Sequence, residues 1–202
     1  DTHYLKKGRR SYFQECYIEG GTDYICAGGT AIFEGCQLKS LGNGSYITAP
    51  EDITAYSTDP VSLKKYYHGF VFRNCTLNSA SGVVVFLGRP WQPTSSSVFI
   101  NSKMENIKPE GWSVWSSTTN HLSSFFFFFY SMDLDVNAVD ISNRVSWSFQ
   151  LTKDEVDTYY TNAIIYSHIA SPTYEPVAIV TALGAPTNTR AAGAELQWDL
   201  VD

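Results

Sequence analysis

Large apolar residues recur in one short pattern at four places along the chain. Each place has a phenylalanine, a small residue three positions later and another apolar residue two positions after that. The four segments are Phe13-x-x-Cys16-x-Ile18, Phe33-x-x-Cys36-x-Leu38, Phe72-x-x-Cys75-x-Leu77 and Phe99-x-x-Ser102-x-Met104. Repeats of about 20 to 40 residues with one alternating strand segment per unit are typical of stacked coils. Because no helical pattern separates the segments, the repeat predicts an all-β fold, a right-handed parallel β-helix.

Three charged residues stand at nearly the same distance before these repeats. Asp23 and Arg89 each precede the small residue of a repeat, Cys36 and Ser102, by thirteen positions, and Asp1 precedes the first such cysteine by fifteen. Neighbouring parallel strands lie about 4.8 Å apart. We therefore expect Asp1 and Asp23 to project from adjacent coils onto one outer face, with Arg89 close to them.

The amino-acid composition limits the classes of molecule that this protein is expected to bind. Aromatic residues make up 15% of the chain and charged residues 17%, which indicates a folded chain rather than a disordered one. The 202 residues include 14 basic and 20 acidic ones, a net charge of -6. Nucleic acid favours a basic surface, so we expect no nucleic-acid partner. An acidic sugar polymer stays compatible with this balance, because local cations can oppose the overall sign. No segment has the length of a membrane span, so we expect no membrane partner.

The cysteines share one repeat position. Cys16, Cys36 and Cys75 are expected to stack as a buried ladder of reduced thiols, because buried free cysteine behaves as a small hydrophobic residue. A disulfide framework is the alternative, and we favour the ladder because neighbouring coils are already joined by backbone hydrogen bonds. Zinc is not expected, since the sequence has no Cys-x-x-Cys pair and its four histidines are scattered.

Three later segments have predictable roles. Residues 50–68 form a long excursion between coils, which we expect to build a binding wall. The run Phe125 to Tyr130 predicts a strand with one face on the core and the other under a loop. The pattern Thr152-Lys-Asp-Glu155 is a capping box that predicts a short helix over about 153–161, placed to cover the open end of the β-helix.

The composition changes towards the C-terminus. Residues 1–170 carry the coils and the predicted helix, and prolines mark 171–184 as an extended linker. Residues 185–202 resemble the opening strands of a fibronectin type III-like module. The chain also opens on Asp1 without a starting methionine, so we expect it to be cut at both ends.

Five segments, in this order, resemble motifs of the pectinesterase (pectin methylesterase) family. They are Asp1-Thr2 followed by Tyr4, Gly20-Gly-Thr-Asp23-Tyr-Ile25, Leu87-Gly-Arg89-Pro-Trp91, Gly111-Trp112-x-x-Trp115, and Asn143-Arg-Val-x-Trp147 with Leu151-Thr152. The likeness covers about 1–165, and the ordered set is specific although each motif alone is weak.

The sequence departs from the family at Cys26-Ala27, where Phe-Gly is usual, and at Pro50, where many members have Gln. We expect these two departures to alter substrate fit. A third, Asp133-Leu-Asp-Val136 in place of Gly-Pro-Gly-Ala, is expected to affect only a loop.

The resemblance implies hydrolysis of galacturonate C6 methyl esters in pectin (homogalacturonan), with release of methanol and pectate. By this resemblance Asp23 is the nucleophile, Asp1 the general acid and then base, and Arg89 the partner that orients Asp23. Trp91 is implied to bind the sugar chain, and Tyr24 to line the same groove. No metal or other cofactor is implied, because carboxylates carry the protons and amide donors hold the oxyanion. Without the resemblance, Asp23 would be interpreted as a turn-forming residue. Arg89 would be interpreted as one member of a surface ion pair.

The resemblance also implies a secreted protein, extracellular or periplasmic, which we expect to be a monomer. The N-terminal half of the family's catalytic domain, with its oxyanion-binding glutamines, has no counterpart here. We therefore expect the isolated chain to be inactive. Two alternatives stay open: a pectate lyase-like β-helix enzyme that uses Ca²⁺, and a non-catalytic polygalacturonate-binding β-helix. Trp112 and Trp115 are interpreted as structural residues.

Overall fold

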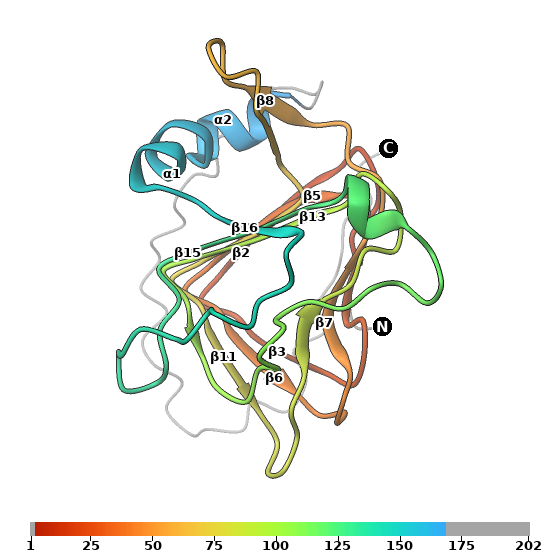
Figure 1. The fold of residues 1–202 in the computed structure, drawn as a ribbon, viewed down its shortest axis with the longest axis vertical. Coiled ribbons are helices and arrows are strands. Elements are labelled where there is room, and N and C mark those ends of the chain that lie inside the picture. The colour runs from red at the N-terminus through yellow and green to blue at the C-terminus, as the bar shows by residue number, and fades with distance from the viewer. Residues whose placement is uncertain (1–2, 169–202) are drawn as a thin grey trace, which may run out of the picture.

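The computed structural model describes residues 3–168 and shows a parallel β-helix (Figure 1). Three sheets of parallel strands, here called sheets A, B and C, form the sides of a prism, and successive coils visit them in that order. The predicted all-β fold class is therefore confirmed. Within residues 3–168, none of the helices has the length and apolar character needed to cross a membrane. The predicted linker 171–184 and module 185–202 lie outside the described residues.

The sheets differ in their number of strands. Sheet A contains β1 (His3–Tyr4), β4 (Ile25–Ala27), β7 (Tyr46–Pro50) and β12 (Phe86–Gly88). Sheet B contains β2 (Arg10–Gln14), β5 (Thr30–Glu34), β10 (Phe70–Arg73), β13 (Ser96–Ile100), β15 (Phe125–Phe129) and β16 (Ser148–Gln150). Sheet C contains β3 (Tyr17–Gly20), β6 (Gln37–Ser40), β11 (Thr76–Ser79) and β14 (Lys103–Met104). The remaining elements are an antiparallel hairpin of β8 (Tyr56–Thr58) and β9 (Lys65–Tyr67), and the helices η1 (Asn120–Ser123), α1 (Lys153–Tyr159) and α2 (Asn162–Ser167).

A column of phenylalanine rings runs through the interior of the prism. Strand pairing in sheet B aligns Phe13 with Phe33, Phe33 with Phe72, and Phe72 with Phe99. The ring centroids are 4.6, 4.5 and 4.5 Å apart and the rings are nearly parallel. This spacing matches the separation of adjacent strands, so each ring covers the next without gaps. The phenylalanines that recur in the sequence therefore occupy equivalent positions in successive coils.

The cysteine ladder is confirmed for two of its three predicted members. Cys36 and Cys75 are buried, and their thiols donate to the backbone oxygens of Phe13 and Phe33 in the preceding coil. Ser102 continues the ladder as a fully buried hydroxyl. Cys16 is only half-buried, which corrects the prediction: within residues 3–168 no coil covers its outer side. All four cysteines are free thiols.

Helices α1 and α2 cover the outer face of sheet B (Figure 1). Thr152 accepts from the Glu155 backbone N–H, and the Glu155 side chain accepts from the Thr152 N–H, so the predicted capping box is confirmed. The expected position is wrong, however. The helices do not close the open end of the β-helix, because Tyr160 and Ile165 pack on outward-facing residues of sheet B such as Val71.

The phenylalanine run forms β15, as predicted. Its alternate side chains serve two apolar clusters: Phe126 packs in the interior of the prism, and Phe127 packs outside with the residues under α1. The strand is paired on both sides, with β13 and with β16. Pairing and burial on both faces explain how five consecutive phenylalanines avoid exposure as an aggregation-prone edge.

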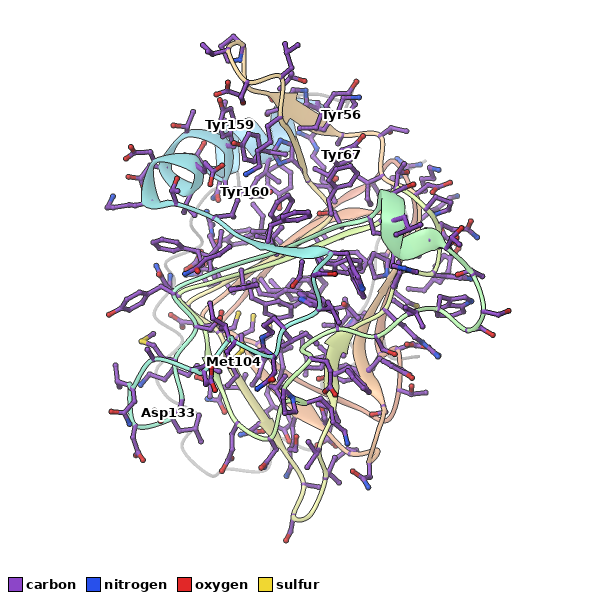
Figure 2. The ribbon with its side chains drawn as sticks, in the orientation of Figure 1. Tyr56, Tyr67, Met104, Asp133, Tyr159 and Tyr160 are labelled. Atoms are coloured by element: carbon purple, nitrogen blue, oxygen red, sulfur yellow. The ribbon has the colours of Figure 1, made fainter. Side chains whose placement is uncertain are left out.

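The excursion at 50–68 contains the β8–β9 hairpin, which packs against α1. The ring of Tyr66 stacks on Tyr159 with centroids 4.0 Å apart, and Tyr67 stacks on Phe125 at 3.9 Å. Figure 2 shows Tyr67, Tyr159 and Tyr160 gathered between the hairpin and the helices. Lys64 pairs with Glu155 at 2.6 Å. These contacts anchor the excursion to the helical layer over sheet B.

His68, at the end of this hairpin, is buried without a full set of partners. Its Nε2 lies 2.9 Å from the Ser57 hydroxyl, while its Nδ1 has no hydrogen-bond partner. Burial, and to a smaller extent the neighbouring His168, lower the pKa of His68 to about 3. The imidazole is therefore neutral in the folded protein at physiological pH.

We predict that a thiol reagent will label about one cysteine, Cys16, in the folded chain and all four after denaturation. The reason is that Cys26, Cys36 and Cys75 are at most 2% exposed, and buried thiols do not meet the reagent. The measurement is the labelling stoichiometry by mass spectrometry. Fast labelling of two or more thiols in the folded state would contradict the ladder.

We also predict that His68 makes the protein less stable as the pH falls. The unfolded chain binds a proton near pH 6.5, whereas folded His68 binds one only near pH 3. The unfolding free energy should therefore decrease between these values, by an amount on the order of 5 kcal/mol at about 1.4 kcal/mol per pKa unit. Urea titrations should show a shallower pH dependence for His68→Gln than for the parent protein. Equal slopes for the variant and the parent protein would refute the assignment.

Candidate active site

Asp23 is held in the turn that leads into β4. Its backbone has a φ of 48°, in the left-handed region that aspartate tolerates better than most residues. Its N–H donates to Tyr46 O at 2.8 Å, which ties the turn to the next coil. The residue is only 9% exposed. A nearly buried carboxylate in an uncommon backbone conformation marks this turn as a candidate functional position.

Arg89 follows β12 and pairs with Asp23 from two coils away. Its N–H donates to Thr48 O at 3.0 Å. Its Nε lies 3.1 Å from Asp23 Oδ1 and its Nη2 lies 2.5 Å from Asp23 Oδ2. This two-point contact fixes both the position and the plane of the carboxylate, which a single cation on a flexible stem would not do. The predicted proximity of Asp23 and Arg89 is confirmed.

Their predicted common phase is wrong. Strand pairing places Ile25 opposite Thr48, and Thr48 opposite Gly88. By this register Asp23 stands level with Phe86 rather than Arg89. The guanidinium therefore reaches back along the strand direction as well as across the intervening coil, which contains β7. Counting from the cysteine ladder missed this offset because the chain between sheets A and B differs in length from coil to coil.

Two aromatic rings enclose the guanidinium. The Cζ of Arg89 lies 4.0 Å from the ring centroid of Tyr46 and 4.2 Å from that of Trp115. Both contacts are cation–π interactions, which strengthen as water is excluded. Trp115 also stacks with Trp91, at 6.0 Å between ring centroids. The structure thus brings an acid, a cation and an aromatic surface together.

The sequence-based interpretation of these aromatic residues needs two corrections. Trp115 is not a core residue, because it is half-buried and contacts Arg89, whereas Trp112 is 1% exposed and structural as expected. Tyr46 was not identified from the sequence. No repeat or motif marks Tyr46, and only the coil register shows that it lies between Asp23 and Arg89.

Tyr24 does not line a groove. Its side chain is 1% exposed, belongs to the interior cluster, and places its hydroxyl 3.2 Å from that of Ser40. The physical reason is that Tyr24 directly precedes β4 and packs with Ile25 of that strand in the interior cluster, whereas Asp23 lies in the preceding turn. Burial raises the pKa of the Tyr24 hydroxyl well above its usual value. The implied substrate-binding role of Tyr24 is therefore wrong.

The departures from the family pattern near the site are also buried. Cys26 and Ala27 are at most 2% exposed, and Pro50, paired with Ala27, is buried as well. Their side chains therefore do not face a substrate in this chain, contrary to expectation. Ala27 has a φ of 83°, a conformation in which glycine is far less strained.

Asp1 lies outside the described residues. The pairing of β1 with β4 aligns His3 with Ile25, and in the sequence Asp1 precedes His3 by the same two positions by which Asp23 precedes Ile25. Asp1 and Asp23 are therefore equally distant, in sequence, from a pair of residues that face each other in neighbouring strands.

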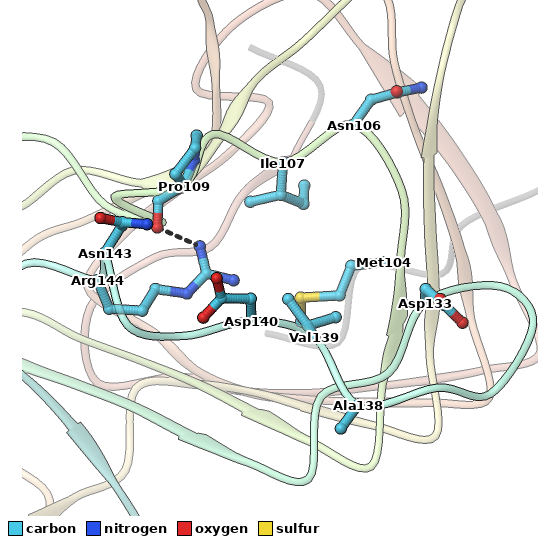
Figure 3. Close-up of a pocket in the computed structure, with 10 residues that line it drawn as sticks. All are labelled: Met104, Asn106, Ile107, Pro109, Asp133, Ala138, Val139, Asp140, Asn143 and Arg144. Atoms are coloured by element: carbon cyan, nitrogen blue, oxygen red, sulfur yellow. Dashed lines mark hydrogen bonds between the residues drawn. The ribbon is translucent and has the colours of Figure 1, made fainter.

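The described residues also form a pocket that does not include Asp23 or Arg89. This pocket has a volume of about 390 Å³ and lies next to β14. Figure 3 shows the guanidinium of Arg144 projecting into it. That guanidinium donates to the backbone oxygens of Lys108 at 2.9 Å and Pro109 at 3.2 Å, so it holds a loop together. Within residues 3–168, no three His, Cys, Asp or Glu side chains are grouped closely enough to hold a metal ion.

Comparisons with known proteins agree on one family. The pectinesterase family model matches residues 1–168. Putative pectinesterase 11 of Arabidopsis thaliana is 34% identical over 157 residues, which are 76% of this chain and 40% of the relative. Probable pectinesterase A of Aspergillus fumigatus is 40% identical over 118 residues, 56% of this chain and 33% of the relative. The chain thus spans less than half the length of these curated relatives.

Solved structures show the same fold. Pectin methylesterase from carrot superposes with a TM-score of 0.64 at 19% identity, covering 82% of this chain and 54% of the carrot enzyme. The pectin methylesterase of Erwinia chrysanthemi superposes with a TM-score of 0.56 at 27% identity, over 85% of this chain and 54% of that enzyme. A pectin methylesterase variant solved with a hexasaccharide is also similar, with a TM-score of 0.56 at 26% identity over 85% of this chain and 54% of that one.

We predict that Arg89→Met will lower the free energy of unfolding by about 1–3 kcal/mol, because it leaves the nearly buried Asp23 carboxylate without its partner. Chemical denaturation measures this difference. Arg9→Met is the matched control, since Arg9 is exposed and such substitutions usually change stability by less than about 0.5 kcal/mol. Equal stability of Arg89→Met and the parent protein would show that the pair contributes nothing.

Proposed function

Because this chain belongs to the pectinesterase family, we propose that it hydrolyses C6 methyl esters of galacturonate in pectin and releases methanol and pectate. The observation that supports this most directly is the Asp23–Arg89 pair. The pair holds a nearly buried carboxylate in a fixed plane, and its arginine contacts Trp115, which stacks on Trp91. The pair also falls on the residues that the family resemblance assigns to the reaction.

In this proposal Asp23 is the nucleophile. Its carboxylate oxygen attacks the ester carbonyl carbon, the carbonyl electrons move onto oxygen, and the C–O bond to the methoxy group then breaks. The product on the enzyme is an anhydride between Asp23 and the galacturonate carboxyl. Arg89 holds the plane of the attacking carboxylate, which reduces the orientational entropy lost in the transition state.

Asp1 is proposed to move the protons. It donates one to the departing methoxide to give methanol, and it then accepts one from the water that cleaves the anhydride. The pairing of His3 with Ile25 supports this role, because Asp1 and Asp23 each precede one of these residues by two positions in the sequence. Two carboxylates on adjacent coils would meet the same ester group from neighbouring positions about 4.8 Å apart.

Trp91 is proposed to bind the sugar chain. Its ring stacks with Trp115, which in turn lies over Arg89, so a sugar placed on this aromatic surface is next to the reacting carboxylate. The stacked rings also restrict the Arg89 side chain. Substrate binding and orientation of the nucleophile therefore depend on the same residues.

The activity of the 202-residue chain by itself is proposed to be low. The chain spans 40% of the Arabidopsis relative, and no residue in the described part has been identified as a donor to the ester oxyanion. Loss of one such donor typically costs about 10²–10³ in rate. We further propose that the protein acts outside the cell, or in the periplasm, as a monomer.

We predict that Asp23→Asn will reduce methanol release from methyl-esterified pectin by about 10³-fold or more, because an amide cannot form the anhydride. The assay uses the longest form of the protein that its gene encodes. Arg89→Lys should lose most of the activity, since a point charge does not replace the planar fork. Asp154→Asn, which changes an exposed carboxylate on α1, should keep normal activity.

The same assay separates the alternatives. Unsaturated oligosaccharide formed only with Ca²⁺, and without methanol, would identify a lyase. Pectate binding without any bond cleavage in the longest form would identify a non-catalytic binding protein. Near-normal methanol release by Asp23→Asn would remove Asp23 from the mechanism.

A further inference from the structure

The turn between β1 and β2 concentrates positive charge on an otherwise acidic chain. The run Lys6-Lys7-Gly8-Arg9-Arg10 contains four of the 14 basic residues, while the chain has a net charge of -6. Lys6, Lys7 and Arg9 are exposed. Arg10 is half-buried, with its Cζ 5.8 Å from the ring centroid of Tyr166. We call Lys6–Arg10 the basic turn.

The three exposed cations lack acidic partners. Among residues 3–168, the ion pairs are Lys64–Glu155, Arg73–Glu34, Arg89–Asp23 and Lys153–Asp157. The side chains of Lys6, Lys7 and Arg9 therefore face solvent without a neutralising carboxylate in the described part of the chain. A surface that gathers uncompensated charge of one sign attracts ligands of the other sign.

The backbone of the basic turn is held firmly against the next coil. The Arg9 N–H donates to Lys6 O at 3.1 Å, and Gly8 has a φ of 75°, which closes the turn tightly. Leu5 donates to Cys26 O at 2.9 Å, and Gly29 donates to Leu5 O at 2.8 Å. The cations thus stand on a rigid scaffold, so that little conformational entropy of the backbone is lost when a ligand binds.

Lys7 is positioned by a glycine. A side chain at Gly28 would place its Cβ 3.1 Å from Lys7 Cβ and 3.2 Å from Lys7 Cγ. The stem of Lys7 therefore lies directly over the Gly28 backbone. Packing of an apolar lysine stem leaves its charged end in solvent.

An open pocket adjoins the basic turn. It has a volume of about 270 Å³, and Gly8 and Gly28 line it together with Thr30 and His168. Gly8 is exposed there, whereas Gly28 is buried. The pocket gives a sugar unit room to lie beside the basic turn.

The basic turn is also within reach of a polymer bound at Asp23. Gly28 follows Asp23 by five residues, roughly 16 Å of extended chain, and Lys7 rests on Gly28 in the neighbouring coil. Asp23 precedes β4 and the basic turn follows β1, so the two lie at opposite ends of neighbouring parallel strands of sheet A. A linear substrate of several sugar units spans this separation.

We propose that the basic turn binds free carboxylates of a polyuronate, the de-esterified stretches of the polymer whose esters are hydrolysed at Asp23. This inference rests on the proposed function, because that reaction turns neutral esters into carboxylates. Neutral methyl esters offer the turn no charge, whereas each free carboxylate can pair with one of its three exposed cations. Such pairs are solvent-exposed, so the binding is weak and sensitive to salt.

The test measures binding, without turnover, of fully de-esterified oligogalacturonate to the 202-residue chain by calorimetry. A triple variant, Lys6→Gln with Lys7→Gln and Arg9→Gln, should bind about tenfold more weakly at low ionic strength, and the difference should shrink at about 0.15 M salt. The matched control changes the same net charge elsewhere: Lys39→Gln with Lys103→Gln and Lys108→Gln. That control should bind within about twofold of the parent. Unfolding midpoints of both variants verify that the fold is kept.

Several outcomes would overturn the proposal. They are unchanged binding by the basic-turn variant, an equal loss in the control variant, and no salt-sensitive binding by the parent chain. Tighter binding of single-stranded DNA than of oligogalacturonate would also overturn it, because the turn would then be a general polyanion surface. Failure of the proposed function appears differently, as absent methanol release with intact binding. The two failures are therefore distinguishable.

Discussion

The stacking of phenylalanine rings at a spacing of 4.5–4.6 Å sets the register on which the rest of this structure depends. A one-residue slip between coils would turn the inward residues of a strand outward, and the rings would lose their partners. The interior thiols and Ser102 obey the same spacing, one coil per step. Loops between coils can then vary widely in length, because the register is restored at each sheet B strand.

The candidate site depends on this variation in the length of the coils. Asp23 and Arg89 come from coils of different length, and their side chains meet because the strands β4, β7 and β12 are locked in register. Tyr46, from the coil between them, and Trp115, from a later one, enclose the guanidinium. A rigid scaffold thus holds a carboxylate in a fixed plane, which is a geometry that a nucleophile requires.

Charge is distributed unevenly over the molecule. An acidic chain repels a polyuronate as a whole, so any contact with such a polymer depends on local cations. Arg89 is paired with Asp23, whereas Lys6, Lys7 and Arg9 are exposed and have no carboxylate partner among residues 3–168. The cation of the candidate site is therefore already paired, and the proposed polyanionic ligand would meet the three exposed cations.

The sequence by itself was sufficient to predict the repeating coil, the Phe125–Phe129 strand, the capped helix and the proximity of Asp23 to Arg89. Each of these features depends on local periodicity or on an ordered set of motifs. Only the tertiary structure decided which residues surround that pair. Tyr24 is adjacent to Asp23 in sequence but turns into the core, while Tyr46 has no motif and meets Arg89 through coil stacking. Similarly, the position of α1 depends on which face of sheet B is apolar, and a capping box contains no information about that distant surface.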